Sequence, residues 1–409
     1  MIDRAHRALL PAGLRDTLPP EAALEARVTE GLASFFAANG YDRVSPPLVE
    51  FEETLLSGSG AATAAQVFRF MDPMSQRMMG VRADITSQVA RIAVTRLVKA
   101  PRPLRLGYAG PVLRVKGSQL RPERQSIQAG VELIGSARAE ADTEVILLVA
   151  EALTDLGVTG VSVDLNLPTL VPAVLAALGV TGEAAERLQR ALYHKDATAL
   201  AAEEGQAASV LGTLVAACCG PADRAVGALA VLDLPPVAAS ERDAFSQVVS
   251  LVRTAAPALT ITIDPVEHCG FEYHAGVSFT VFARGAQGEL GRGGRYRVIG
   301  NGTVAEEVAV GATLFVDAVL EVLPPQATVS SRRLLLPHGT TRATVRSLQA
   351  ADWITVVALD PKEDLLKSAV KLGCSHVLVD NRIVSRAFLE CCSVGAESHL
   401  ARNFGTRKK

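Results

Sequence analysis

The sequence predicts an α+β fold: a mainly antiparallel sheet flanked by helices, with a helical insertion and a small C-terminal α/β domain. Segments with the apolar alternation of strands lie on both sides of residues 169–256, where the composition shifts to Ala, Leu and Val at helical spacing. Strand and helix patterns then alternate over residues 331–392. We therefore expect a core domain over 1–325, a small domain over 331–392 and a disordered tail over 393–409.

Composition narrows the class of protein. The chain has 409 residues, 49% of them hydrophobic, which is enough to fill more than one domain. A formal net charge of −2 gives no global attraction to nucleic acid or anionic membranes. No apolar run is long enough for a membrane span or a signal peptide, so we expect a cytoplasmic protein. The six cysteines form no C-x-x-C pair and histidine is sparse, so we expect no zinc site or disulfide framework. We also expect no cofactor.

The N-terminal half alternates helices and strands. An apolar stripe from Leu24 to Phe36 predicts a helix over 21–40, which Asn39-Gly40 end. Pro46-Pro47 predict an extended segment, and VFRFMDPMSQRMMGV predicts a hairpin that turns at Asp72-Pro73. A helix over 84–98, two strands in LRLGYAGPVLRV and SIQAGVELIG, a helix over 139–156 and a strand in VSVDLNL follow.

Beyond this half, the insertion over about 169–256 is predicted to be all-helical. Strands return in LTITIDP, VSFTVFAR and GELGRGGRYRVIG, and EEVAVGATLFVDAVLEVL has a helix-like pattern. After a linker-like PPQATVSS, three strands (RLLLPHG, WITVVALD and HVLVD) alternate with helices near 340–350 and 362–371. We find no internal repeat.

Two polar segments have a structural interpretation beside a functional one. In Val81–Thr86 a strand enters a helix, so Asp84 or Thr86 could simply cap that helix. The segment from residue 102 to residue 124 contains six basic residues and one acidic residue, which gives it a local net charge of +5. Arginines in such a loop could hold phosphate, or the loop could be an ordinary solvated hairpin tip.

Two further segments are weak signals when each is taken alone. Cys269–Gly276 has aromatic and histidine side chains that could line a site, although a strand end with a turn is the simpler interpretation. Gly291–Tyr296 has neither the Walker lysine nor the G-x-G-x-x-G spacing, so a glycine-rich turn is the simpler interpretation there.

Gln128 and Glu132 point more directly to a site. They share a predicted strand with the apolar residues Val131, Leu133 and Ile134, so both side chains are expected to face inward. A carboxylate inside a pocket requires a cationic partner or a ligand.

In this order and spacing, the segments resemble histidyl-tRNA synthetase over about residues 10–320. The resemblance implies a class II aminoacyl-tRNA synthetase-like sheet and a homodimer through residues near 40–55. The segments that carry it are Pro11–Asp16 (the family's opening), Gly40–Glu50 (motif 1, its dimer-forming element), Arg82–Thr86 (its R-P-E-G-T segment), Gly110–Arg114 with Gln128–Gly135 (motif 2) and Gly293–Tyr296 (the approach to motif 3).

The sequence departs from the synthetases at the positions that serve adenylation. Cys269 stands where R-G-L-D-Y-Y has its arginine, and Ala318 aligns with the nucleotide-binding arginine of motif 3. In motif 2, Lys116 replaces a glutamate and Gln125–Ile127 replace E-F-H. Adenylation holds a triphosphate against a carboxylate, so losing two arginines would remove roughly 3–6 kcal/mol of stabilisation. We therefore expect no aminoacylation.

The amino-acid side of the site is retained. Asp84, Thr86, Gln128, Glu132 and Tyr273 match the family's histidine-binding positions. A carboxylate and polar oxygens suit an α-ammonium group and an imidazole N–H. With Arg114 and His274 added, these residues are the predicted histidine-like ligand pocket.

A synthetase scaffold without its catalytic arginines is similar to the regulatory subunit of ATP phosphoribosyltransferase in bacterial histidine biosynthesis. That resemblance implies a partner, the short-form catalytic subunit, which the regulatory subunit activates in a hetero-octamer of four and four. It also implies histidine as a feedback effector. Residues 331–392 resemble a shortened anticodon-binding domain.

Two alternatives remain open at this point. An active histidyl-tRNA synthetase is opposed by Cys269, Ala318 and the short C-terminal unit. A tRNA-binding synthetase paralogue would use the basic residues of 102–124, although the near-neutral overall charge makes a nucleic-acid partner the weaker expectation.

Overall fold

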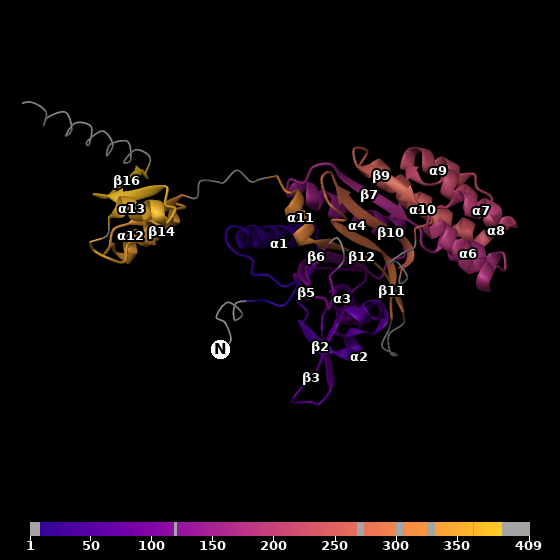
Figure 1. Cartoon of the computed structure of the whole chain (residues 1–409), viewed down its shortest axis with the longest axis horizontal. Coiled ribbons are helices and arrows are strands. Elements are labelled where there is room, and N and C mark those ends of the chain that lie inside the picture. The colour runs from indigo at the N-terminus through magenta and orange to yellow at the C-terminus, as the bar shows by residue number, and fades with distance from the viewer. Residues whose placement is uncertain are drawn as a thin grey trace, which may run out of the picture. The chain divides into compact units, whose positions relative to one another are not determined.

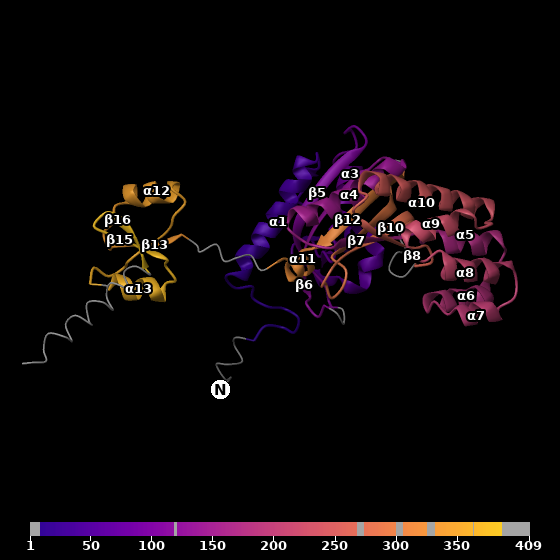
Figure 2. The same ribbon diagram turned by 90° about the horizontal axis from the view of Figure 1, so that it is seen from above.

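The computed structural model describes residues 9–117, 121–267, 274–299, 306–324, 332–362 and 364–386. The chain divides into two compact units, Met1–Pro324 and Pro325–Lys409. The first unit is built on a nine-stranded mixed sheet with helices (Figures 1 and 2), which confirms the α+β prediction.

The large sheet is mostly antiparallel, with one parallel pair near each end. Its order is β1-β5-β6-β12-β11-β10-β7-β9-β8. The strands are β1 (Asp42–Arg43), β5 (Leu104–Leu113), β6 (Gln125–Ile134), β7 (Val161–Asn166), β8 (Gly220–Pro221), β9 (Thr260–Asp264), β10 (His274–Ala283), β11 (Gly291–Val298) and β12 (Glu307–Phe315).

The two faces of this sheet differ because side chains alternate along each strand. Ala129, Val131 and Leu133 of β6 are buried in the main hydrophobic core, which they share with helices α1 (Glu21–Ala38), α4 (Ala139–Asp155) and α10 (Pro236–Ala255). Gln128 and Glu132 point to the opposite face. There, α3 (Thr86–Thr95) and the 3₁₀ helix η2 (Gly58–Gln66) pack against the sheet.

A three-stranded sheet lies beside α3. It has the order β2-β4-β3, with β2 (Val49–Phe51), β3 (Phe68–Met71) and β4 (Met78–Val81), and α2 (Glu52–Leu55) follows β2. The β3–β4 pair is the predicted hairpin, and Asp72 caps its turn by accepting hydrogen bonds from Met74 N and Ser75 N. β4 leads directly into the loop that carries Asp84.

The insertion is helical, with one exception. Its helices are α5 (Leu170–Ala177), α6 (Gly182–Tyr193), α7 (Ala197–Ala202), α8 (Gln206–Ala217), α9 (Ala222–Ala230) and α10. The exception is β8, two residues that add an antiparallel edge to β9. The all-helical prediction was therefore wrong at Gly220–Pro221, where Pro221 sits at the sheet edge that tolerates proline.

The helix predicted for EEVAVGATLFVDAVLEVL was wrong over its first half. Residues Glu307–Phe315 form β12, which lies between β6 and β11, and only Val316–Val322 form a helix, α11. A central strand is buried on both faces and reads as a continuous apolar run, so its sequence cannot be distinguished from a buried helix by periodicity. Pairing with β6 on one side and β11 on the other makes this segment a strand.

The second unit is a small α/β sheet of order β14-β13-β15-β16. Its elements are β13 (Arg333–Leu336), α12 (Arg342–Ala350), β14 (Ile354–Val357), α13 (Leu365–Lys371), β15 (His376–Val379) and β16 (Arg382–Ser385). The first five match the predicted order, and β16 was not foreseen. In neither unit does a described helix combine the length and apolar character needed to cross a membrane.

Candidate functional site

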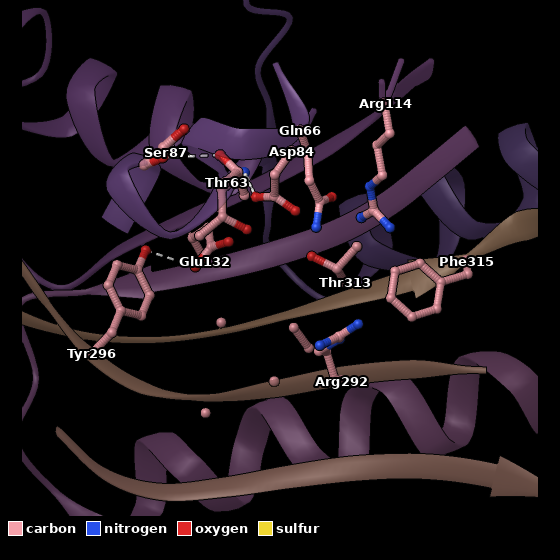
Figure 3. A pocket seen from close by; sticks show the side chains of 16 residues that line it. Thr63, Gln66, Asp84, Ser87, Arg114, Glu132, Arg292, Tyr296, Thr313 and Phe315 are labelled. Atoms are coloured by element: carbon pink, nitrogen blue, oxygen red, sulfur yellow. Dashed lines mark hydrogen bonds between the residues drawn. The ribbon is translucent and has the colours of Figure 1, made fainter. Parts of the chain in front are cut away.

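A cavity of about 210 Å³ lies between the polar face of the large sheet and the α3–η2 layer. Its floor comes from β6, β11 and β12, and its other wall from η2, the start of α3 and the end of β5 (Figure 3). The predicted site residues Asp84, Thr86, Arg114 and Glu132 all line it. Figure 3 shows Glu132 with Tyr296 at one end of the cavity and Arg114 with Phe315 at the other.

Glu132 is fully buried and is surrounded by hydroxyl groups. The Tyr296 hydroxyl donates to its Oε2 at 2.8 Å, and the Tyr108 hydroxyl lies 3.5 Å from its Oε1. Among the residues that the structure describes, no lysine or arginine forms an ion pair with this carboxylate. Burial therefore raises the pKa of Glu132 to about 8, although hydrogen bonds from Tyr296 and Thr86 oppose the shift.

Gly311 of β12 makes room for this carboxylate. It pairs directly with Glu132 in the β12–β6 register, and a Cβ atom at position 311 would lie 1.7 Å from Glu132 Oε2. Any larger residue would displace the carboxylate, so the strand needs glycine at this position for close approach.

Asp84 and Gln128 form a second polar group beside Glu132. Gln128 Nε2 donates to Asp84 Oδ2 at 2.9 Å, and Gln128 Oε1 accepts from the Ile85 backbone N–H at 3.1 Å. Asp84 Oδ1 accepts from the Thr86 backbone N–H at 2.9 Å, where α3 begins. The N-cap of α3 is Ile85, which makes no side-chain cap hydrogen bond, so the capping interpretation was wrong. Asp84 makes this local bond ahead of the helix, and it also lines the cavity.

The opposite end of the cavity is cationic. Arg114 projects from just beyond β5 and its Nε donates to Ala83 O at 3.3 Å; burial lowers the pKa of this guanidinium, which stays protonated as arginines do in proteins. Arg292 of β11 lies there too, 2.9 Å from Glu289 and 5.6 Å from the centre of the Phe315 ring. Two guanidinium groups, one from each wall, thus lie at the same end of the cavity as an aromatic ring.

A second cavity, of about 370 Å³, adjoins this cationic end. It shares Arg114, Arg292 and Phe315 with the first cavity, and Asp317 and Arg121 line it farther away. The Arg121 guanidinium stands 5.1 Å from the Phe315 ring and donates to Glu289 O. The Phe315 ring therefore stands where the two cavities meet.

The basic residues of 102–124 do not gather into one phosphate-binding loop in the part of the segment that is described. Arg102 makes a bidentate ion pair with Glu307, at 2.6 and 2.8 Å, and Arg105 makes one with Glu144, at 2.6 and 2.7 Å. Arg124 is bonded to backbone carbonyls. Arg102 and Arg105 therefore hold neighbouring elements together through ion pairs, and Arg124 does so through hydrogen bonds.

Two predicted residues stand apart from the cavity wall. Gln128 lies behind Asp84, and His274 is buried on β10 opposite Tyr296, with its ring beside Gly294. Neither is among the described residues that line the cavity. Tyr273 and Cys269 lie outside the described residues.

Sequence reasoning missed four residues that complete the site. Tyr108 and Tyr296 bond Glu132, Thr313 contacts the Tyr108 hydroxyl at 2.7 Å, and Arg292 adds a cation. Alternation along β5, β11 and β12 puts them on the same face as Glu132, but only the strand order reveals that those strands are neighbours.

Gly291–Tyr296 lies within β11, which confirms the strand predicted for GELGRGGRYRVIG and shows that the turn interpretation was wrong. A Cβ atom at Gly293 would lie 2.4 Å from Gly311 O, so the glycines let β11 and β12 approach closely beneath the cavity.

Comparisons with known proteins point to one family. Residues 13–319 match the histidyl-tRNA synthetase family model. The ATP phosphoribosyltransferase regulatory subunit of Paramagnetospirillum magneticum is 59% identical over 384 residues, which cover 94% of this chain and 99% of that protein.

Two solved structures show the same fold. One, from Bacillus halodurans, is described as an ATP phosphoribosyltransferase regulatory subunit/histidyl-tRNA synthetase; it has a TM-score of 0.77 and 22% identity, and the match covers 90% of this chain and 97% of that one. A chain of the ATP phosphoribosyltransferase complex from Thermotoga maritima has a TM-score of 0.56 and 18% identity, with 72% and 97% covered. These neighbours confirm the predicted class II synthetase-like fold.

Proposed function

The chain belongs to the family of ATP phosphoribosyltransferase regulatory subunits, and from this premise we propose that its synthetase-like cavity is the histidine sensor of that enzyme. As a member, it is a regulatory subunit acting in histidine biosynthesis. We further propose that it binds and activates the short-form catalytic subunit, and that histidine in the cavity reverses this activation.

The observation that carries the sensor proposal is the environment of Glu132. Burying a carboxylate is costly unless it is paired, and here hydroxyl groups take the place of a cation. An imidazole ring offers the missing partner, because its N–H donates to a carboxylate and its protonated form carries the compensating charge. Asp84 and Thr86, also on the cavity wall, offer oxygen atoms to an α-ammonium group.

A ligand is the better explanation of this environment than stability alone. Replacing a buried ionisable group by an apolar one of similar size often leaves stability unchanged or improves it. A glycine at position 311 lacks the packing contacts that a side chain would make in the middle of the sheet, and it leaves space for the carboxylate. Both features favour a site kept for binding.

The test is phosphoribosyl-ATP formation by a cognate catalytic subunit with this protein titrated in. We expect the rate to rise to a stoichiometric plateau and histidine to suppress it. Glu132→Gln should still activate but should respond to histidine only at about 100-fold higher concentration, since it loses a hydrogen bond to a charged group within a buried network. Glu140→Gln is the control, because Glu140 bonds Arg138 at the surface.

Two outcomes would contradict the proposal. A rate that ignores the protein would remove the activating role. Unchanged histidine inhibition in Glu132→Gln, with activation intact, would move the sensor to another site.

Aminoacylation is proposed to be lost. Ala318, buried on α11, replaces the nucleotide-binding arginine of the synthetases, and the Phe315 ring stands at the junction of the two cavities. Neither alanine nor phenylalanine can neutralise a triphosphate. We expect no histidine-dependent exchange of pyrophosphate into ATP; exchange at a synthetase-like rate would overturn this.

For assembly, we propose a homodimer through residues near 40–55 and a hetero-octamer with four catalytic subunits. The support is the motif 1 resemblance and the description of the Thermotoga maritima structure as a complex. Light scattering of the chain alone and with the catalytic subunit should give the masses of a dimer and of a four-plus-four assembly. A monomer that stays monomeric would contradict the first.

A further inference from the structure

The cavity has two chemically different ends. The residues that match the synthetases' histidine-binding positions assign no part of the ligand to the second, cationic end. Glu132, Asp84 and the surrounding hydroxyls can accept from an imidazole and an ammonium group. A zwitterionic amino acid also carries a carboxylate, which needs donors with positive charge. In the synthetase pattern one arginine belongs to the segment where this chain has Cys269.

We propose that Arg292 of β11 binds the α-carboxylate of the ligand, and thereby makes the cavity selective for an amino acid over the corresponding amine. This rests on the proposed histidine site. Arg292 reaches the cavity from the floor strand, opposite Arg114, so a cation is supplied from the sheet (Figure 3).

The surroundings of Arg292 hold its guanidinium in position. Glu289 contacts Nη2 at 2.9 Å, and the Phe315 ring lies 5.6 Å from the guanidinium carbon. A guanidinium has five N–H donors in a rigid fork, so one contact with Glu289 leaves donors that match the two oxygens of a carboxylate. Preorganisation of this kind reduces the entropy lost on binding.

The location of Arg292 also matches the size of the ligand. Gly293 and Gly294 follow it on β11 and line the cavity without side chains, and Tyr296 comes next at the Glu132 end. One strand thus presents a cation, an open floor and a hydroxyl in succession. Between them there is space for a small molecule in a cavity of about 210 Å³.

The experiment compares L-histidine with histamine, which has the same imidazole and ammonium groups and no carboxylate. Isothermal titration calorimetry on the full chain should show that histidine binds at least about 10-fold more tightly than histamine. Arg292→Gln should weaken histidine roughly 10- to 100-fold and leave histamine unchanged. Arg292→Lys should recover part of the histidine affinity because it keeps the charge.

The matched control is Arg297→Gln. Arg297 lies on the same strand, is exposed and pairs with Glu306 at 3.4 Å, so its loss should change neither affinity. Thermal unfolding of each variant checks that the fold is intact.

Three outcomes separate the inference from its premise. If Arg292→Gln binds histidine as tightly as the unmodified chain, Arg292 has no role in recognition. If it weakens histidine and histamine equally, Arg292 shapes the cavity and does not bind the carboxylate. If the unmodified chain binds no histidine, the proposed sensor site itself fails, and this inference with it.

Discussion

The two adjoining cavities of the synthetase-like unit have different chemistry. In the first, Glu132, Asp84 and Thr86 keep the polar groups of an amino-acid site, with tyrosine hydroxyls arranged around the buried carboxylate. In the second, which begins at Phe315, Arg121 is engaged with Glu289 and the Phe315 ring. Ala318, which we align with the arginine of motif 3, is buried in the main hydrophobic core and is not among the described residues that line this cavity.

Under the proposed function, this difference explains how one scaffold loses a reaction and keeps a ligand. Amino-acid binding depends on a few buried contacts on the face of β6 and its neighbours. Adenylation requires several cations fixed around a triphosphate, and it fails when two of them are absent. A regulatory subunit needs only the first set. Each prediction below alters one of the two cavities.

The largest effect is expected from Gly311→Ala in the first cavity. Its Cβ atom would lie 1.7 Å from Glu132 Oε2, and a buried carboxylate inside a packed sheet has little room to move. We expect roughly 2–4 kcal/mol lower stability in urea unfolding, together with loss of histidine binding.

Gly212→Ala on α8 is the control for that substitution, because nothing lies within 4 Å of its added Cβ atom. It should raise stability by up to about 1 kcal/mol through helix propensity. Equal effects of the two substitutions would mean that Gly311 is not needed to accommodate Glu132.

The next effect concerns pH. The pKa of Glu132 is about 8 in the folded chain, raised by burial above its ordinary value of 4.5. The folded state therefore binds this proton more tightly, and the associated stability is present below pH 4.5 and lost as pH rises to about 8. Between those limits the unmodified chain should lose roughly 2–4 kcal/mol that Glu132→Gln does not lose.

Glu144→Gln provides the opposite case for the same urea experiments. Its hydrogen bond with Arg105 lowers the pKa of Glu144, so its contribution is present above its ordinary pKa and is lost as the solution becomes acidic. Identical pH profiles for the unmodified chain and Glu132→Gln between pH 4.5 and 8 would show that Glu132 is not titrating in this way.

The smallest effect is a gain in the second cavity. Replacing Phe315 by glycine should open the junction between the two cavities, and replacing Ser126, which lines the second cavity, by arginine should add one cation there. We expect ATP to bind about 10-fold more tightly than to the unmodified chain in equilibrium dialysis, as for one added charged hydrogen bond. Histidine affinity should stay within about threefold. If ATP binding does not change, neither the Phe315 ring nor the missing positive charge is what closes this cavity to nucleotides.

The sequence was informative where chemistry is local. Alternation in SIQAGVELIG placed Gln128 and Glu132 on one buried face, as the structure has them. The hairpin turn at Asp72 also followed from short-range turn preferences.

It failed where the outcome depends on which strands become neighbours. The apolar run of β12 looked helical because pairing with β6 and β11, absent from any local pattern, decides its structure. The same is true of Arg292 and Tyr296. Their register beside β12 brings both onto the cavity floor that Glu132 shares, and Tyr296, which bonds Glu132, is 164 positions from it in sequence. The sequence predicted a strand in GELGRGGRYRVIG, but it did not show which strands would lie beside it.

One measurement compares the two cavities directly: the affinity of the unmodified chain for L-histidine and for a non-hydrolysable histidyl-adenylate analogue, histidyl-sulfamoyl-adenosine, in parallel calorimetric titrations. A synthetase holds such an intermediate analogue far more tightly than its amino acid, because both halves of the site contribute. For this chain we predict that histidine binds and that the analogue binds no more tightly than histidine. An analogue bound about 100-fold or more tightly than histidine would contradict the account, because the nucleotide half would then still be working.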